Sequence, residues 1–391
     1  MRAAMELDQA WSLLLVTVLA ALLPGLSKMA RLPAVVLEIL CGIVLGQSVL
    51  QLELGGEWLG FLAELGFLVL MFQAGMEIDF SVLRRLRARE FGVHCAMFCA
   101  TLGLALLGAV ALGQGFFLAL VLSTTSLGLV VPSLKEAGLS RTRLGQNALI
   151  ASTLADFLTL LAITFFLLWH EKGLNWQFLW PVPLFVGFGV LLKLARLWAW
   201  WFPDRMGRLL DPQDSVELGM RLSLALLFFF VALSELVHLE PVLGAFMGGA
   251  LLSFVFKEKG GLETKISGLG YGFLIPLFFI HVGMDFDLKN LLSVEQVLFT
   301  FKLLGLALMV KVVPSLLLVL NRISPFESLK LGFLLSSRLS LIVVAAALGF
   351  ETGFITAVYK DSIILLAVCT CLIGPSAFKL LHHFSRQGLQ V

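Results

Sequence analysis

The sequence predicts an all-α polytopic membrane protein of about thirteen transmembrane helices, built from two inverted six-helix repeats with two crossed discontinuous helices. Three observations lead to this prediction. Of the 391 residues, 59% are hydrophobic and only 14% are charged, against about 25% in soluble domains, and the mean hydropathy is +0.98. The apolar residues fall into thirteen segments, and two of these segments resemble each other. A soluble globular fold is therefore excluded.

The apolar segments have the length that a membrane crossing requires, which is roughly 20 helical residues. The first segment lacks a basic flank followed by a small-residue cleavage site, and Glu6 and Asp8 precede it, so we expect a span rather than a cleavable signal peptide. The predicted spans cover residues 10–27, 33–50, 58–77, 91–113, 115–134, 144–169, 177–199, 218–238, 239–257, 267–284, 292–320, 326–350 and 357–384.

Basic residues indicate how these spans are oriented. With the N-terminus outside, the inside loops hold nineteen of the 28 Lys and Arg residues and the outside segments hold four. Because short cytoplasmic loops carry the excess of Lys and Arg, we predict a multi-pass plasma-membrane protein, in a bacterial inner membrane, with its N-terminus outside and its C-terminus cytoplasmic. The nineteen are Lys28, Arg31, Arg84, Arg85, Arg87, Arg89, Lys135, Arg141, Arg143, Arg196, Arg205, Arg208, Lys257, Lys259, Lys265, Arg322, Lys330, Lys379 and Arg386, and the four are Arg2, Lys172, Lys289 and Lys360.

An internal repeat connects the two halves of the chain. The segment GFLVLMFQAGMEIDF at 66–80 resembles GFLIPLFFIHVGMDFDL at 272–288, which has two residues inserted and starts 206 residues later. At the same offset Gly42 matches Gly248. The third span thus corresponds to the tenth and the second to the ninth, and the single seventh span inverts the second unit. Such inverted repeats are typical of secondary transporters, whose sites lie at mid-membrane.

The fifth and sixth spans contain the strongest candidate site. Asp156 is a lone acid in the sixth span, where a carboxylate costs roughly 2.5–3.5 kcal/mol. Irregular backbone at this depth is tolerated where it lines a cavity or is buried in protein. Freed carbonyls, hydroxyls and the carboxylate together predict a site for a monovalent cation at Asp156. The polar and helix-breaking residues that interrupt the fifth span are Ser123, Thr124, Thr125, Ser126, Gly128 and Pro132.

Two further groups of polar residues lie in the spans. Ser152 is one helical turn before Asp156 on the same face, so its hydroxyl is either another ligand or bonded back to its own helix. The sequence leaves both open. The twelfth span corresponds to the fifth in the repeat, and we expect it to be the second discontinuous helix. Its interruption consists of Ser336, Ser337, Arg338 and Ser340.

Six motifs, in order along nearly the whole chain, resemble the monovalent cation:proton antiporters, in the branch with bacterial sodium/proton exchangers and potassium-efflux antiporters. The motifs are ELGFLVLMFQAGMEID (64–79), STTSLGLVVPSLKEAGLSRTRLGQ (123–146), ASTLADFLTLL (151–161), GAFMGGALLS (244–253), PLFFIHVGMDFDL (276–288) and SSRLSLIVVAAALG (336–349). The resemblance implies exchange of protons for Na⁺ or K⁺ by elevator-type alternating access, with no cofactor.

The resemblance also carries roles to individual residues. Asp156 matches the family's ion-binding aspartate, Thr125 the hydroxyl of the first break, and Lys311 the lysine of the core. Thr124 and Ser126 flank Thr125 and are further candidates. One departure concerns Ala155, since many relatives have Asp-Asp or Asn-Asp where this chain has Ala155-Asp156. The usual partner of the lysine is therefore missing, and we expect Lys311 to pair with Asp156.

The second break supplies structural candidates. Arg338 matches an arginine of the family's second broken helix and is expected to satisfy carbonyls freed by the break, with Ser337 beside it in the same core-structural role.

The resemblance implies a homodimer within the lipid bilayer. Helices 1–3 (1–90) and 8–10 (218–290) would form the scaffold and dimer interface, helices 4–6 (91–170) and 11–13 (291–391) the mobile core, and 171–217 the linker helix. No basic stripe indicates a nucleic-acid partner. A separate soluble regulatory subunit stays open, although no segment of this chain indicates one.

Two other functions stay open. A sodium-coupled organic-anion symporter, such as a bile-acid transporter, shares the crossed-helix architecture but requires a larger cavity. A ligand-gated potassium efflux system would require a soluble ligand-binding domain, and none is readable after the last span. An enzyme is not expected, because no nucleophile–base arrangement is readable. The five cysteines lie in apolar segments without His or acid partners at metal-ligand spacing.

Overall fold

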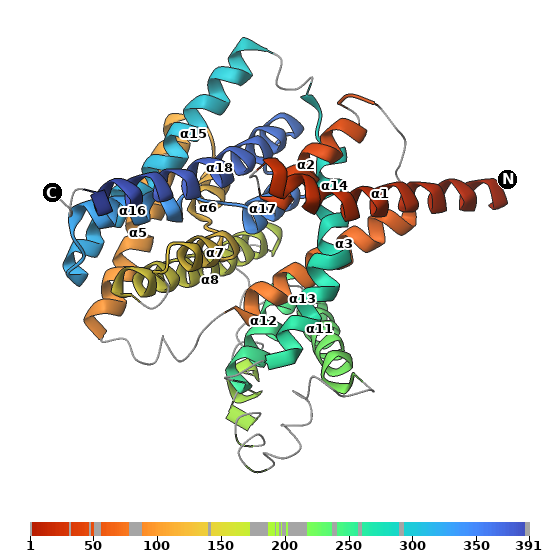
Figure 1. The fold of residues 1–391 in the computed structure, drawn as a ribbon, viewed down its shortest axis with the longest axis horizontal. Helices are drawn as coiled ribbons and strands as arrows, with labels where there is room; N and C mark the ends of the chain where they lie inside the picture. Colours follow the sequence, from red (N-terminus) through yellow and green to blue (C-terminus); the bar gives the residue numbers. More distant parts are fainter. Residues whose placement is uncertain are drawn as a thin grey trace. The chain divides into compact units, whose positions relative to one another are not determined.

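Helices make up almost all of the structure. The computed structural model describes residues 2–30, 33–46, 48–50, 56–77, 88–139, 142–172, 187–191, 193–194, 197, 201, 217–236, 241–256, 260–288 and 293–387 (Figure 1). Within these ranges there is no strand, which agrees with the predicted all-α class. The chain divides into two compact units, each made from two stretches of sequence: 1–81 with 164–285, and 82–163 with 286–391.

The first unit is built around two helix pairs, with α2 packed on α14 and α3 packed on α12. In the predicted repeat, α2 corresponds to α12 and α3 to α14, so each pair is the image of the other. Its helices are α1 (Arg2–Ala30), α2 (Ala34–Leu45), α3 (Glu57–Met76), α11 (Leu218–Leu236), α12 (Pro241–Val255), α13 (Gly260–Leu269), the π-helical turn η2 (Gly270–Leu274) and α14 (Ile275–Met284).

Glycines bring the backbones of each pair into contact. A Cβ added at Gly42 of α2 would collide with the backbone of Ile280 and Gly283 in α14. A Cβ added at Gly249 of α12 would likewise collide with the backbone of Phe72 in α3. Small residues that allow close backbone approach are the usual contact between membrane helices, where dispersion replaces the hydrophobic effect. Both helix pairs thus have a close glycine contact, and in α12 this contact is made by Gly249, the neighbour of the Gly248 that matches Gly42 in the repeat.

This contact predicts a stability effect. Gly249→Leu should lower the thermal midpoint of the detergent-solubilised protein, because overpacking costs about 1–3 kcal/mol and the obstacle here is backbone. Gly268→Ala is the matched control, since a Cβ at Gly268 in α13 meets nothing within 4 Å. Equal midpoints for the two variants would refute the proposed contact.

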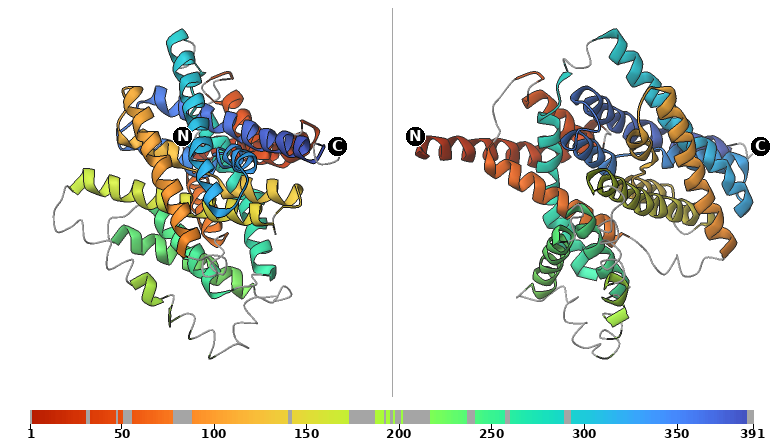
Figure 2. Two further views of the ribbon diagram at one scale, coloured as in Figure 1. Left: turned by 90° about the vertical axis from the view of Figure 1, so that its left-hand side faces the viewer. Right: turned by 180° about the vertical axis from the view of Figure 1, so that it is seen from behind.

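The second unit contains both discontinuous helices. Figure 2 shows its helices, coloured gold to olive and light to dark blue, from two further directions. They are α5 (Ala88–Ala111), α6 (Phe116–Ser123), α7 (Leu127–Glu136), α8 (Arg143–Lys172), α15 (Val294–Ser315), the 3₁₀ turn η4 (Leu316–Asn321), α16 (Pro325–Leu335), α17 (Ser340–Glu351) and α18 (Ala357–Gln387); α8 passes into the other unit after Ile163.

Both predicted breaks are present. The first separates α6 from α7 at 124–126, and the second separates α16 from α17 at 336–339. Hydroxyls next to the breaks bond to the preceding turn: Thr124 Oγ1 donates to Val121 O (2.8 Å) and Ser336 Oγ to Phe333 O (2.6 Å). These bonds offer the backbone an alternative to helix continuation. The first break is narrower than predicted, since Gly128 lies inside α7.

Each predicted span contains a described helix except 177–199, which lies mostly outside the described residues, and several helices begin or end beyond the predicted bounds. Among the described residues, eight helical segments are long and apolar enough to cross a membrane, and four shorter apolar ones accompany them. The protein is therefore a multi-pass membrane protein, with a count of thirteen remaining a prediction. The eight are α1, α3, α5, α8, α11, α13–η2–α14, α15–η4 and α18; the shorter ones are α2, α6–α7, α12 and α17.

Candidate functional site

Two buried cations hold the end of α6 at the first break. Lys311 Nζ, from α15, donates to Ser123 O (2.7 Å) and to Thr125 Oγ1 (2.6 Å). Arg338 donates through Nη2 to Leu122 O (2.8 Å). The last carbonyls of a helix have no partner within the helix and carry the negative end of its dipole. Both basic side chains therefore donate to terminal carbonyl groups of α6.

Arg338 also connects three parts of the second unit. Its guanidinium is fully buried and donates to Ala307 O of α15 (2.9 Å) and to Ser336 O at the end of α16 (3.1 Å). Its own carbonyl accepts from Cys371 Sγ of α18 (3.0 Å). The planar guanidinium has five N–H donors and can therefore bond to several carbonyl groups at once, which the ammonium of a lysine cannot do in the same geometry.

Asp156 lies at the other side of the first break. Its Oδ2 accepts a hydrogen bond from the backbone N–H of Leu127 (3.3 Å), the first residue of α7. A carboxylate at a helix N-terminus is stabilised by free N–H groups and by the positive end of the dipole. One turn further along α8, Thr159 Oγ1 donates to Ser123 O (3.4 Å). The break thus has basic side chains at its α6 end and a carboxyl group at its α7 end.

The other predicted site residues are placed as follows. Thr124 and Ser126 are buried within the first break. Ser152 Oγ donates to Ala148 O (2.9 Å), so the back-bonded alternative is present, and its lone pairs remain acceptors. Ser337 is buried in the second break, where Gly374 of α18 leaves room for its hydroxyl. Lys311 bonds to Ser123 and Thr125 in the break, and its pairing with Asp156 stays a prediction.

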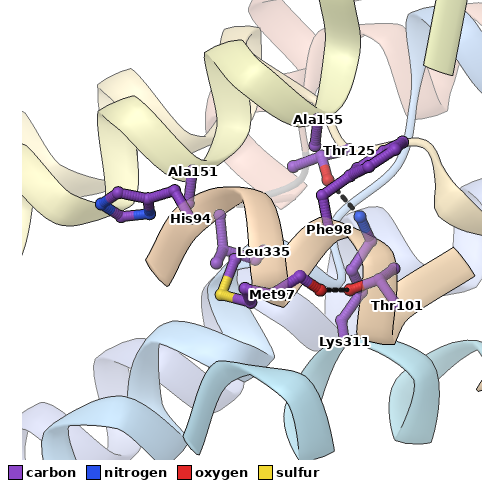
Figure 3. Close-up of a pocket in the computed structure, with 9 residues that line it drawn as sticks. All are labelled: His94, Met97, Phe98, Thr101, Thr125, Ala151, Ala155, Lys311 and Leu335. Carbon is purple, nitrogen blue, oxygen red and sulfur yellow. Dashed lines mark hydrogen bonds between the residues drawn. The ribbon is translucent and has the colours of Figure 1, made fainter. Parts of the chain in front are cut away.

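A small cavity adjoins these residues on the side of α5. Its volume is about 10 Å³, the room of one water molecule. Ala155 lines it, so the methyl group at the position where the resemblance implies an acid or amide faces this space beside Lys311 and Thr125 (Figure 3). The full lining is His94, Met97, Phe98, Thr101, Thr125, Ala151, Ala155, Lys311 and Leu335.

The carbonyl of Ser123 belongs to the predicted interruption of the fifth span. Two contributors were missed from the sequence: the hydroxyl of Thr159, which is a common residue in a span, and the imidazole of His94. His94 does carry a sequence signal, because an ionisable residue inside an apolar span is a candidate functional residue by default.

Comparison with known proteins identifies the family of this chain. The family model described as sodium/hydrogen exchanger, transmembrane, matches residues 14–382. A putative Na⁺/H⁺ antiporter of Bacillus subtilis, YjbQ, is 33% identical over 96% of this chain, and the chain covers 64% of that protein's length. GerN of Bacillus cereus, named as a Na⁺/H⁺-K⁺ antiporter, is 25% identical over 96% of both proteins.

A solved structure supports the fold. The sodium proton antiporter MjNhaP1 of Methanocaldococcus jannaschii superposes with a TM-score of 0.68 over 97% of this chain and 98% of that one, at 14% sequence identity. The family match covers most of the chain and confirms the resemblance drawn from the six motifs. The chain belongs to the sodium/hydrogen exchanger family.

Proposed function

We propose that the protein is a secondary active antiporter that exchanges protons for a monovalent cation, Na⁺ or K⁺, by elevator-type alternating access. The observation that carries this proposal is the contact of Asp156 with the start of α7, at a break whose other end is held by Lys311. Asp156 supplies one negative charge that either a cation or a proton balances, so the two compete and the binding of one releases the other.

Hydroxyls and carbonyls beside Asp156 would replace part of the cation's hydration shell. Oxygen ligands of this kind suit hard cations. The candidates are Thr124, Thr125, Ser126 and Ser152, and the metal they would hold is the transported ion itself. Lys311 is proposed to couple cation binding to proton release.

The division into two compact units supports this proposal, because an elevator requires a moving part and a fixed part. Both breaks, with Asp156, Lys311 and Arg338, belong to the unit of 82–163 and 286–391, which we propose moves as the core. The unit of 1–81 and 164–285 would be the fixed scaffold and dimer interface. The homodimer, the bacterial inner membrane and the outside N-terminus belong to the same proposal.

The names of the relatives favour Na⁺, K⁺ or both as the cation. The cavity beside Lys311 and Thr125, with room for about one water molecule, favours a small ion over the organic anion of the symporter alternative.

The experiment uses proteoliposomes with a trapped pH-sensitive dye. Addition of Na⁺ or K⁺ outside should make the lumen more alkaline, because an inward cation is exchanged for an outward proton. Li⁺ and a bile acid are tested in turn at equal osmolarity. The proposal fails if no cation moves protons, or if the bile acid drives Na⁺ uptake instead.

A further inference from the structure

The cavity beside the site has a second end at a buried histidine. Thr125 and Lys311 lie at one end of it, and His94 of α5 lies at the other, next to Ala151 of α8 (Figure 3). His94 is only 1% exposed. The cavity therefore extends from the ion site into the interior of the second unit.

His94 belongs to a buried polar cluster, which we define as His94, Asn147 and Asn321. Asn321 Nδ2 donates to Asn147 Oδ1 (3.1 Å), and Asn147 Nδ2 donates to Arg143 O (2.8 Å). Among the described residues, neither ring nitrogen of His94 nor Oδ1 of Asn321 reaches a partner in good hydrogen-bond geometry, although the amide of Asn147 lies close to His94.

Such atoms indicate water. A buried polar atom without a partner costs about 1–3 kcal/mol, and buried water is the usual way in which proteins satisfy it. The cavity has the volume for one water molecule, and its polar lining includes His94, Thr125 and Lys311. The cluster and the cavity together have the features of a hydrated path.

The path has a charged end towards the surface. Glu90, one turn before His94 on α5, is 3.7 Å from Arg143, and both side chains are partly exposed. The helices α6 and η4, which also pack on α5, contain no titratable residue. The titratable or charged groups that α5, α8 and α15 carry besides His94 are Arg89, Glu90, Cys95, Cys99, Arg143, Asp156, His170, Glu171, Lys172, Glu295, Lys302 and Lys311.

We propose that His94 is a proton-transfer residue, which carries the exchanged proton between the ion site and the Glu90–Arg143 end of the second unit through water in this cavity. This inference rests on the proposed antiport. The exchanged proton leaves the ion site when its bond there breaks and a new O–H bond to the water forms, and the water gives one of its protons to a ring nitrogen of His94. His94 is then the imidazolium, which releases its proton towards solvent.

The test separates proton transfer from cation movement. Proteoliposomes containing the full chain are assayed for Na⁺-driven proton movement and for exchange of external ²²Na⁺ with internal Na⁺ at equal pH, which requires no net proton transfer. His94→Gln keeps a polar side chain but does not titrate. It should slow Na⁺/H⁺ exchange by about 100-fold, the lower end of what a positioned proton-transfer group contributes, and leave ²²Na⁺/Na⁺ exchange within about two-fold.

Two further variants complete the design. Ala151→Val, which adds volume at the cavity beside His94, should reproduce the selective loss with the histidine present. His170→Gln makes the same chemical change at an exposed position at the end of α8 and should alter neither rate.

The inference is overturned if His94→Gln and Ala151→Val exchange Na⁺ for H⁺ at the unmodified rate. It is also overturned if His94→Gln slows Na⁺/H⁺ exchange and ²²Na⁺/Na⁺ exchange equally, because His94 then has a structural role only. If the unmodified protein exchanges ²²Na⁺ but moves no protons, the proposed function fails and the inference with it.

Discussion

Replacement of Asp156 by asparagine should reduce cation/proton exchange to the level of empty liposomes while the protein stays folded. The amide oxygen of Asn can still accept from the Leu127 N–H, so the start of α7 keeps its cap. What is lost is the negative charge, without which neither a cation nor a proton is held. The measurement is the lumenal dye response to Na⁺ and K⁺, with gel filtration to verify the fold.

A matched control is Glu351→Gln, which neutralises an exposed acid at the end of α17. It should exchange like the unmodified protein. Appreciable antiport by Asp156→Asn with unchanged cation affinity would contradict the assignment of Asp156 as the shared site.

Replacement of Arg338 by methionine should produce the largest loss of stability. Three carbonyl oxygens, those of Leu122, Ala307 and Ser336, would lose their guanidinium donor in the buried interior. Each such loss costs about 1–3 kcal/mol. Because native proteins are stable by only about 5–15 kcal/mol, we expect little monodisperse protein or a strongly lowered thermal midpoint.

Two comparisons make this prediction specific. Arg143→Met removes an arginine whose ion pair with Glu90 is partly exposed, and such pairs contribute about 0–1 kcal/mol. Arg338→Lys keeps the charge but not the planar fork, and its stability should fall between the other two. An Arg338→Met protein as stable as Arg143→Met would show that the carbonyls are satisfied in another way.

The helices and both breaks were predictable because their signals are local. Runs of apolar residues mark the spans, and hydroxyls near Thr124 and Ser336 mark the interruptions. The tenth span was predicted to begin at 267, yet its helix begins at Gly260, since the turn around Glu263 and Lys265 is helical but polar. Hydropathy locates the part of a helix that lies in hydrocarbon, not the whole helix.

The contacts of the site were less predictable, because they join distant residues. Asp156 was identifiable from its cost in the membrane, and Lys311 from the family resemblance. That Lys311 would bond to Ser123 and Thr125 depends on how α15 lies against α6, which no local pattern encodes. The cavity and the position of His94 depend in the same way on the packing of several helices.

The arrangement of Lys311 and Arg338 at the end of α6 has a consequence for biosynthesis. The contacts with Ser123 and Leu122 join residues separated by 188 and 216 positions. At about 5–20 residues per second, a ribosome needs roughly 10–40 s to cover that interval. During this time the newly inserted α6 has carbonyls whose partners have not yet been synthesised. Until the second half of this unit is synthesised and inserted, these carbonyl groups of α6 must therefore be hydrated or bound by the insertion machinery.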